Sequence, residues 1–134
     1  MTSYTIKNIK QEVEDAAPKF GLAPDMEARF ARRDLEAEKI GLSYEHLAPN
    51  VRVAFGHKHE DQEEIYVVVE GSGRVKLDEE IRDVSCWDAV RVAKDTIRNF
   101  EAGPDGLTLI AVGGPAKGEN DAEMIQNWWT DGSA

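Results

Sequence analysis

The chain has little of several residue types and patterns, and each scarcity excludes a class of protein. Its 134 residues include one cysteine, Cys86, so the chain can form no internal disulfide and no zinc site built from several cysteines. No apolar run reaches the roughly 20 residues that a membrane-spanning helix needs. The N-terminal residues also lack the apolar segment of a secretory signal. We therefore expect a cytoplasmic protein with no membrane partner.

Positive charge is the scarcer sign. The chain has 16 lysines and arginines against 26 aspartates and glutamates, which gives a formal net charge of −10. Such a surface repels the phosphates of nucleic acids and of anionic lipids. The sequence therefore predicts no nucleic-acid partner. The hydrophobic fraction of 41% and the length fit one globular domain with its own core.

Short segments in which apolar and polar residues alternate predominate from Gly41 onwards, and this pattern is typical of β-strands. Between them, Gly, Pro, Asp and Asn predict turns, and we expect residues 71–73 (Gly-Ser-Gly) to end a strand. About seven or eight short strands at this spacing indicate an all-β sandwich or barrel. The expected strands are residues 41–49, 50–59, 64–70, 74–77, 81–85, 88–93, 97–102 and 107–114.

The N-terminal part is less regular. Asn8 can cap a short helix over residues 9–17, which Pro18 would end. Residues 21–35 fit neither period cleanly, and we interpret them as an edge strand.

Near the other end, Trp128 and Trp129 are expected to hold a polar tail against the domain. We predict a single domain over residues 1–134. It divides into an N-terminal arm (1–40), a barrel core (41–113) and a C-terminal tail (114–134).

The stretch FGHKHEDQEEIYVVVEGSG holds the strongest candidates for chemistry. His57 and His59 are one residue apart, so on a strand they point the same way, with Cα atoms roughly 6–7 Å apart. Both imidazoles could then reach one metal ion at about 2.0–2.2 Å. Glu64 follows after a short turn and can return to the same face. Two histidines and a carboxylate resemble the ligands of iron and zinc enzymes with open positions for substrate, although spacing alone equally fits ordinary polar residues on a sheet.

The same residues carry a resemblance to a known family. His57, His59, Glu64 and Gly71 have the spacing of the first conserved motif of the cupins, in which only the leading glycine is replaced, by Val51. The resemblance covers roughly residues 40–113. It implies a cupin-type jelly-roll β-barrel, here with a short, partly helical N-terminal segment, and it implies that these side chains face the interior.

The second cupin motif is degenerate. Arg98 stands where the family has its fourth metal ligand, a histidine, and a guanidinium cannot coordinate a cation. Three interpretations of Arg98 stay open. It pairs with Glu64 inside a barrel that holds no metal, or it binds a carboxylate or phosphate of a ligand, or it turns away and leaves a three-ligand metal site. Four other motif positions also depart from the family, at Trp87, Ala93, Asp95 and Ala102.

Two further side chains are candidates for the interior. His46 alternates with Leu42 and Tyr44 on a strand that we expect to enter the barrel, either as a fourth metal ligand or ligand contact or as a hydrogen-bonded interior histidine. Tyr66 shares a face with Glu64 and can present its hydroxyl to a ligand, or it is buried with that hydroxyl satisfied.

The resemblance implies two functions. In the first, which we favour, His57, His59 and Glu64 bind a divalent ion (Fe, Mn, Ni or Zn). The barrel also binds a small organic molecule, and Arg98 contacts any anionic group on it. The family includes dioxygenases, isomerases and decarboxylases, so neither the reaction nor whether this chain is an enzyme is decided. In the second, the chain is a metal-free ligand-binding or structural cupin in which Arg98 pairs with Glu64. In either case we expect a homodimer.

Overall fold

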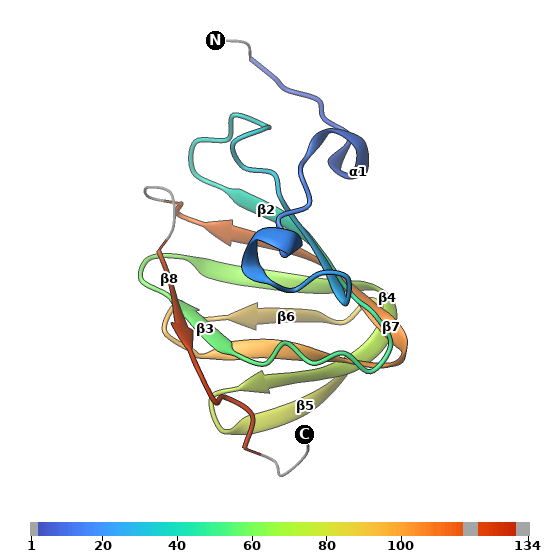
Figure 1. Ribbon diagram of the computed structural model, residues 1–134. Helices are drawn as coiled ribbons and strands as arrows, with labels where there is room; N and C mark the ends of the chain where they lie inside the picture. The colour runs from blue at the N-terminus through green and yellow to red at the C-terminus, as the bar shows by residue number, and fades with distance from the viewer. Residues whose placement is uncertain (1–2, 117–120, 131–134) are drawn as a thin grey trace.

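Antiparallel strands form most of the computed structural model, which describes residues 3–116 and 121–130. These residues contain eight strands, one α-helix and one 3-10 helix (Figure 1), so the predicted all-β class is confirmed. None of the described helices is long and apolar enough to span a bilayer. Parts of the predicted arm and tail, at residues 1–2, 117–120 and 131–134, lie outside the described residues. The strands are β1 (Met26–Phe30), β2 (Gly41–Leu47), β3 (Gly56–His59), β4 (Glu63–Leu77), β5 (Glu80–Ser85), β6 (Ala89–Val92), β7 (Arg98–Gly114) and β8 (Ala122–Ile125).

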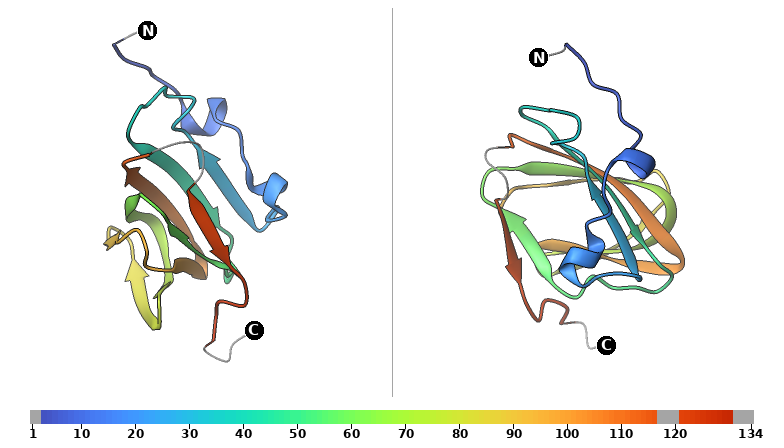
Figure 2. Two further views of the ribbon diagram at one scale, coloured as in Figure 1. Left: turned by 90° about the vertical axis from the view of Figure 1, so that its left-hand side faces the viewer. Right: turned by 45° about the horizontal axis from the view of Figure 1, so that its top comes forward.

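Two long strands, β4 and β7, organise the barrel by pairing with each other along two stretches. Where β7 residues 107–114 pair with β4 residues 63–71, the neighbours are β2 and β1 on one side and β6 on the other. Where β7 residues 98–102 pair with β4 residues 73–77, the neighbours are β3 and β8 on one side and β5 on the other. The strands therefore form one eight-stranded sheet whose two halves, joined through β4 and β7, face each other like two sheets as the whole curls around an interior (Figure 2).

The expected break at residues 71–73 is wrong, because β4 continues through it. Register shifts between Val68 and Glu70 and between Gly71 and Gly73 bend the strand instead of ending it. Gly71 has a φ of 78°, and a Cβ at either glycine would collide with the backbone of β7. The two strands expected at residues 97–102 and 107–114 are likewise one strand, β7, since the intervening turn residues stay within it.

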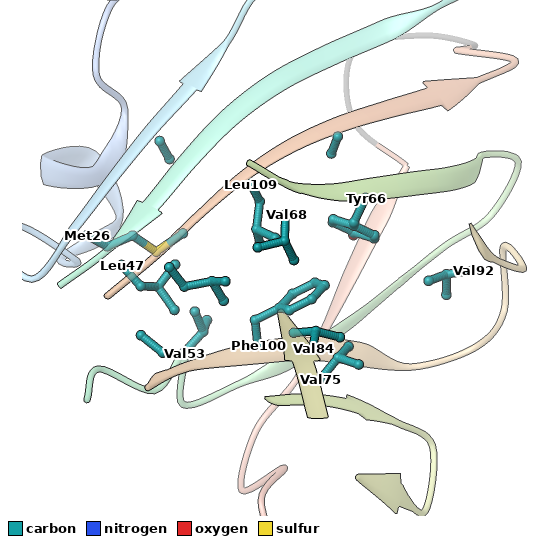
Figure 3. Packing of buried hydrophobic residues seen from close by; sticks show 14 of the residues in the cluster. Met26, Leu47, Val53, Tyr66, Val68, Val75, Val84, Val92, Phe100 and Leu109 are labelled. Atoms are coloured by element: carbon teal, nitrogen blue, oxygen red, sulfur yellow. The ribbon is translucent and has the colours of Figure 1, made fainter. Parts of the chain in front are cut away.

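The core fills the space between the two sheets. Tyr66 of β4 and Phe100 of β7 lie at its centre, with ring centroids 4.9 Å apart (Figure 3). Both are nearly inaccessible to solvent, as are Val68 and Leu109 on the neighbouring strand segments. The outer face of residues 64–70 is less covered than its apolar sequence suggests, because Ile65 remains 45% exposed. The strand is therefore fully buried on one face only.

The N-terminal helix, α1 (Ile9–Glu12), is shorter than predicted. Its cap is confirmed, since the Asn8 side chain accepts hydrogen bonds from the backbone N–H groups of Lys10 and Gln11. It ends before residues 13–17 because this segment pairs with β1: Asp15 bridges Arg29, and the N–H of Ala16 donates to Ala28. Pro18 lies instead in the 3-10 helix η1 (Ala17–Phe20).

The barrel extends beyond its predicted limits of residues 41–113. The edge strand expected within residues 21–35 is confirmed as β1, which pairs with β2 along its whole length. On the other side, β8 pairs with β3 in a part of the chain where we expected only a tail. The arm and the tail therefore each contribute a strand to the sheets.

Candidate functional site

A cavity of about 390 Å³ opens into the barrel interior, a size at the small end of the range for ligand sites. His57 and His59 of β3 and Glu64 and Tyr66 of β4 all line it, so the predicted shared face is correct. A second hollow, of about 540 Å³, lies over β5 and the middle of β7. It contains no histidine, and the charged groups of Arg74 and Glu101 in it pair with each other at 2.6 Å. The barrel cavity is therefore the better candidate site.

The two histidines and the glutamate converge at one end of this cavity. Nε2 of His59 lies 3.0 Å from Oε1 of Glu64, and Nε2 of His57 lies 3.8 Å from the same oxygen. The two imidazole rings stand at right angles, with centroids 5.4 Å apart. One ligand atom from each of the three residues lies within 4.8 Å of the others. His57, His59 and Glu64 therefore form a group that could hold a metal ion.

Arg98 pairs with the glutamate, as in the first of its three predicted interpretations. Its Nη2 donates to Oε1 of Glu64 at 2.6 Å, and its Nη1 donates to the carbonyl of Thr96 at 2.8 Å. Its side chain is fully inaccessible and does not line the cavity. The predicted contact between Arg98 and an anionic ligand is therefore not supported, because the guanidinium is buried and is already paired with Glu64.

Tyr66 connects these groups. Its hydroxyl donates to Oε1 of Glu64 at 2.6 Å and lies 3.3 Å from Nε2 of His57, and Nε of Arg98 donates to it at 3.3 Å. Burial, together with the negative charge of Glu64, raises the pKa of Tyr66 well above its ordinary value. The tyrosine is therefore a buried phenol with its hydroxyl satisfied, and its side chain also borders the cavity.

His59 lies between two carboxylates. Its Nδ1 is 2.7 Å from Oδ1 of Asp121, which precedes β8, and its Nε2 faces Glu64. Burial alone would lower the pKa of His59, but the hydrogen bond to Glu64 and the contact with Asp121 outweigh it and raise that pKa. Burial would likewise raise the pKa of Glu64, yet its contacts with His57 and His59 hold it well below its usual range. The two carboxylates therefore stabilise the doubly protonated form of the His59 ring relative to an ordinary histidine.

His57 has different surroundings. Its Nδ1 lies 3.4 Å from the side-chain nitrogen of Asn99, which also donates to the carbonyl of Phe55 at 2.9 Å. Burial lowers the pKa of His57, and the nearby carboxylate of Glu64, 3.8 Å from Nε2, opposes this only in part. Two histidines on one strand are thus pushed towards opposite protonation states.

Glu45 of β2 is a second carboxyl group on the cavity wall. It shares its face of the sheet with its partner in β7, the core residue Leu109. Burial, helped by the negative charge of Glu64, raises the pKa of Glu45 to about 7. This carboxyl therefore changes its charge near neutral pH.

The expected position of His46 is wrong. It is next to Glu45 on β2, so its side chain points to the opposite face of the strand, away from the cavity. There its Nδ1 lies 2.8 Å from the hydroxyl of Thr108. The predicted alternation along β2 is confirmed, but the face that points into the cavity is that of Glu45 and not that of His46.

Sequence reasoning did not identify Asp121, Glu45 or Asn99. Asp121 follows His59 by 62 residues, and no local pattern connects them. Glu45 is the neighbour of His46 and therefore lies on the face that the sequence analysis did not consider for the interior. Asn99 follows Arg98 directly, and its amide could have been noticed as a polar group beside a degenerate motif.

The C-terminal segment is held in place as predicted. The indole nitrogen of Trp129 donates to the carbonyl of Val53 at 2.7 Å. Trp128 is 7% exposed and covers the buried amine of Lys76, which lies 3.5 Å from the centre of the indole ring and donates to the Trp128 carbonyl. These contacts fix the strand β8 and, with it, Asp121 beside the histidines.

No family model and no curated protein matches this chain in sequence. Solved structures do match it in fold. A cupin protein from Bacteroides fragilis is 22% identical, with a TM-score of 0.69 over 90% of this chain and 93% of that one. KdgF from Halomonas sp. is 19% identical, with a TM-score of 0.66 over 87% and 96%. Streptomyces Pac13, described as a nucleoside dehydratase, is 14% identical, with a TM-score of 0.71 over 95% and 92%. The predicted cupin-type barrel is therefore confirmed as a fold.

Proposed function

Starting from this cupin fold, we propose that the chain is an enzyme that binds a small polar organic molecule in the barrel cavity and transfers a proton on it without a metal ion. The observation that supports this most is the contrast between two histidines on one strand. His59 contacts a carboxylate with each ring nitrogen, whereas the nearest polar contacts of His57 are a phenol and an amide. The two rings therefore suit opposite tasks in proton transfer.

In this proposal His59 is the proton donor and His57 the proton acceptor. Glu64 and Asp121 stabilise the positive charge of His59 before a ligand binds. Desolvation of the His57 ring disfavours its charged form, so this ring is assigned to accept the proton. Because Arg98 balances Glu64, and Asp121 balances His59, the polar end of the cavity carries no net charge before the ligand binds.

A dehydration would use both groups. His57 would take a proton from carbon, and the electron pair of that C–H bond would become a carbon–carbon π bond. The C–O bond would break as the hydroxyl group took a proton from His59 and left as water. An isomerisation would use the same two transfers, with the proton from His59 added at another atom of the substrate. Neither reaction needs an oxidant or a reductant.

The comparisons add support for this class of reaction. Pac13 is described as a nucleoside dehydratase, and variants of it have been solved with uridine. The similarity to this chain is one of fold, so uridine enters here as a first probe. The cavity size fits a small organic molecule of this kind.

The test is a screen for turnover or hydrogen exchange. We would incubate the protein with uridine, other nucleosides and hydroxy-ketone sugars in D2O with a chelator, and follow loss of C–H signals and appearance of alkene signals by NMR. The variants His57→Gln and His59→Gln should lose the reaction. His46→Gln is the matched control, since it removes a histidine from the outer face of the same barrel. Absence of any reaction across the panel, or equal rates in all variants, would contradict the proposal.

A second candidate function is binding of a divalent ion by His57, His59 and Glu64. The short distances between their ligand atoms favour it, and so does Asp121, which contacts Nδ1 of His59 and leaves Nε2 for an ion. Against it, the permanent charge of Arg98 contacts the only carboxylate of the set. A bound Fe, Mn, Ni or Zn ion would act as a Lewis acid on an oxygen of the ligand.

Elemental analysis by plasma mass spectrometry separates the two candidates. Protein purified without chelators would be compared with a His57→Ala/His59→Ala variant. We expect little metal in either protein. About one equivalent of a transition metal in the parent, lost in the variant, would replace the metal-free proposal with the metal site. Activity that appears only after an ion is added would have the same meaning.

The predicted homodimer remains a proposal. Ile65 and Val112 are register partners on the outer face of β4 and β7 and are 45% and 41% exposed. An apolar outer pair of this kind would be covered in a dimer. Sedimentation equilibrium measures the mass directly, and a monomer at all concentrations would contradict the proposal. The cytoplasmic location likewise remains a prediction.

A further inference from the structure

Glu45 is a polar group in the cavity for which the fold supplies no partner. Among the described residues it makes no hydrogen bond and no ion pair, and its partly exposed side chain borders the cavity. A carboxyl in a largely apolar cavity is normally paired with a donor or a cation, because it is otherwise poorly solvated. The other acidic groups on the cavity wall are paired: Glu64 with Arg98, and Asp121 with His59. Glu45 is therefore the one whose hydrogen-bonding capacity remains for a ligand.

The cavity near Glu45 is largely apolar. Its wall comes from the arm, from β1, from the segment before β3 and from β8, so several separate elements contribute to one apolar surface. A molecule that reached both Glu45 and the histidines would place its middle against this surface. The apolar side chains include Leu22, Met26, Val53, Phe55 and Met124.

The charge of Glu45 decides which group of a ligand can lie beside it. At the polar end of the cavity the charges of Glu64, Arg98, His59 and Asp121 cancel in pairs. Arg32 also lines the cavity, where its guanidinium donates to the carbonyls of Glu38 and Ala116. When Glu45 is ionised, an anionic group placed against it would be repelled, whereas a hydroxyl or an ammonium group could donate to the carboxyl.

We propose that Glu45 anchors the ligand of this cavity by accepting a hydrogen bond from a hydroxyl or ammonium group, while the apolar part of the ligand lies against the side chains named above. The ligand class is a small amphiphilic molecule that presents a hydroxyl or ammonium group, and not a carboxylate or phosphate, to Glu45. This inference rests on the proposed function, in that it places the same molecule against the same histidines. It assigns to Glu45 a positioning role that selects the ligand and that is separate from proton transfer.

The experiment uses three probes of similar size: 2-phenylethylamine, 2-phenylethanol and phenylacetate. Binding to the full chain in neutral buffer would be measured by NMR titration, with the methyl signals of Met26 and Met124 as reporters inside the cavity. We expect the amine and the alcohol to bind, and the amine to bind at least about tenfold more tightly than the carboxylate. In Glu45→Gln, which keeps the size of the side chain, the preference for the amine should disappear.

Glu63→Gln is the matched control, because Glu63 is an exposed carboxylate paired with Arg91 and does not line the cavity. The control should behave as the parent protein. Tighter binding of phenylacetate in the parent, an unchanged ranking in Glu45→Gln, or failure of all three probes to shift the cavity signals would each overturn the inference. If Glu45→Gln leaves the ranking unchanged while His59→Gln still abolishes turnover in the screen above, the inference fails and the proposed function stands.

Discussion

Replacing Glu45 by glutamine should make the stability of the folded protein less dependent on pH between weakly acidic and weakly alkaline conditions. In the native fold, burial and the charge of Glu64 raise the pKa of Glu45 from 4.5 to about 7, and Arg98 opposes this only in part. The unfolded chain has the ordinary value. Folding therefore favours the protonated carboxyl.

The direction and the size of the pH effect on stability follow from the difference between the pKa values of Glu45 in the folded and unfolded states. Below the unfolded value of 4.5, Glu45 is protonated in both states and its contribution is fully present. As the pH rises towards about 7, the unfolded chain loses a proton that the folded protein keeps, so stability falls. Above the folded value the loss is complete and amounts to about 3 kcal/mol, since each pKa unit corresponds to about 1.4 kcal/mol.

The assay is urea unfolding of the parent protein and of Glu45→Gln across this pH range. Other groups, including His57 and His59, titrate in the same range, so the quantity to compare is the difference between the two proteins at each pH. That difference should shift in favour of the variant by about 3 kcal/mol from the acidic to the alkaline end. The exposed change Glu63→Gln should produce no such shift. Parallel stability curves for parent and Glu45→Gln would refute the reasoning.

Three further predictions concern the groups around the cavity. Arg98→Met should lower the free energy of unfolding by about 3–5 kcal/mol, because it removes the fully buried cation of a paired carboxylate and leaves Glu64 with His59 alone; a loss below about 1 kcal/mol in urea unfolding would contradict this. Asp121→Asn should lower the pKa of His59, because the contact with Asp121 helps to raise it, and an NMR titration of the ring that gave an unchanged pKa would exclude that cause. Trp128→Ala should lower the free energy of unfolding by about 3–5 kcal/mol, since a buried indole is removed from above a buried amine; an unchanged melting temperature would show that the segment is not held there.

The fold could be predicted from the sequence because alternation and turn residues are local signals. They located most strands, and the spacing of His57, His59 and Glu64 identified the face on which these side chains meet. They failed at residues 71–73 and in the middle of β7. Glycines there were interpreted as turns, whereas they allow a long strand to bend while its pairing continues on both sides.

The site was predicted less completely, for two physical reasons. Side chains on a strand alternate between two faces, and the sequence does not say which face points inwards. The prediction placed His46 in the interior, whereas the structure places its neighbour Glu45 there. The tail also reaches the site from far along the chain, and the sequence contains no signal that places Asp121 beside His59. The contact between Arg98 and Glu64 was among the alternatives, but only a structure could select it.

The pairing of β8 with β3 has a consequence for how the site comes into being. His59 is synthesised 62 residues before Asp121, and at typical rates of about 5–20 residues per second this separates them by roughly 3–12 s. Both β3 and β4 pair with β7, which is complete only at Gly114, so the wall that holds His57, His59 and Glu64 forms late in that interval, and until Asp121 follows, Nδ1 of His59 has no carboxylate beside it. The charge of His59 is therefore set only after the rest of the cavity wall around it has been made.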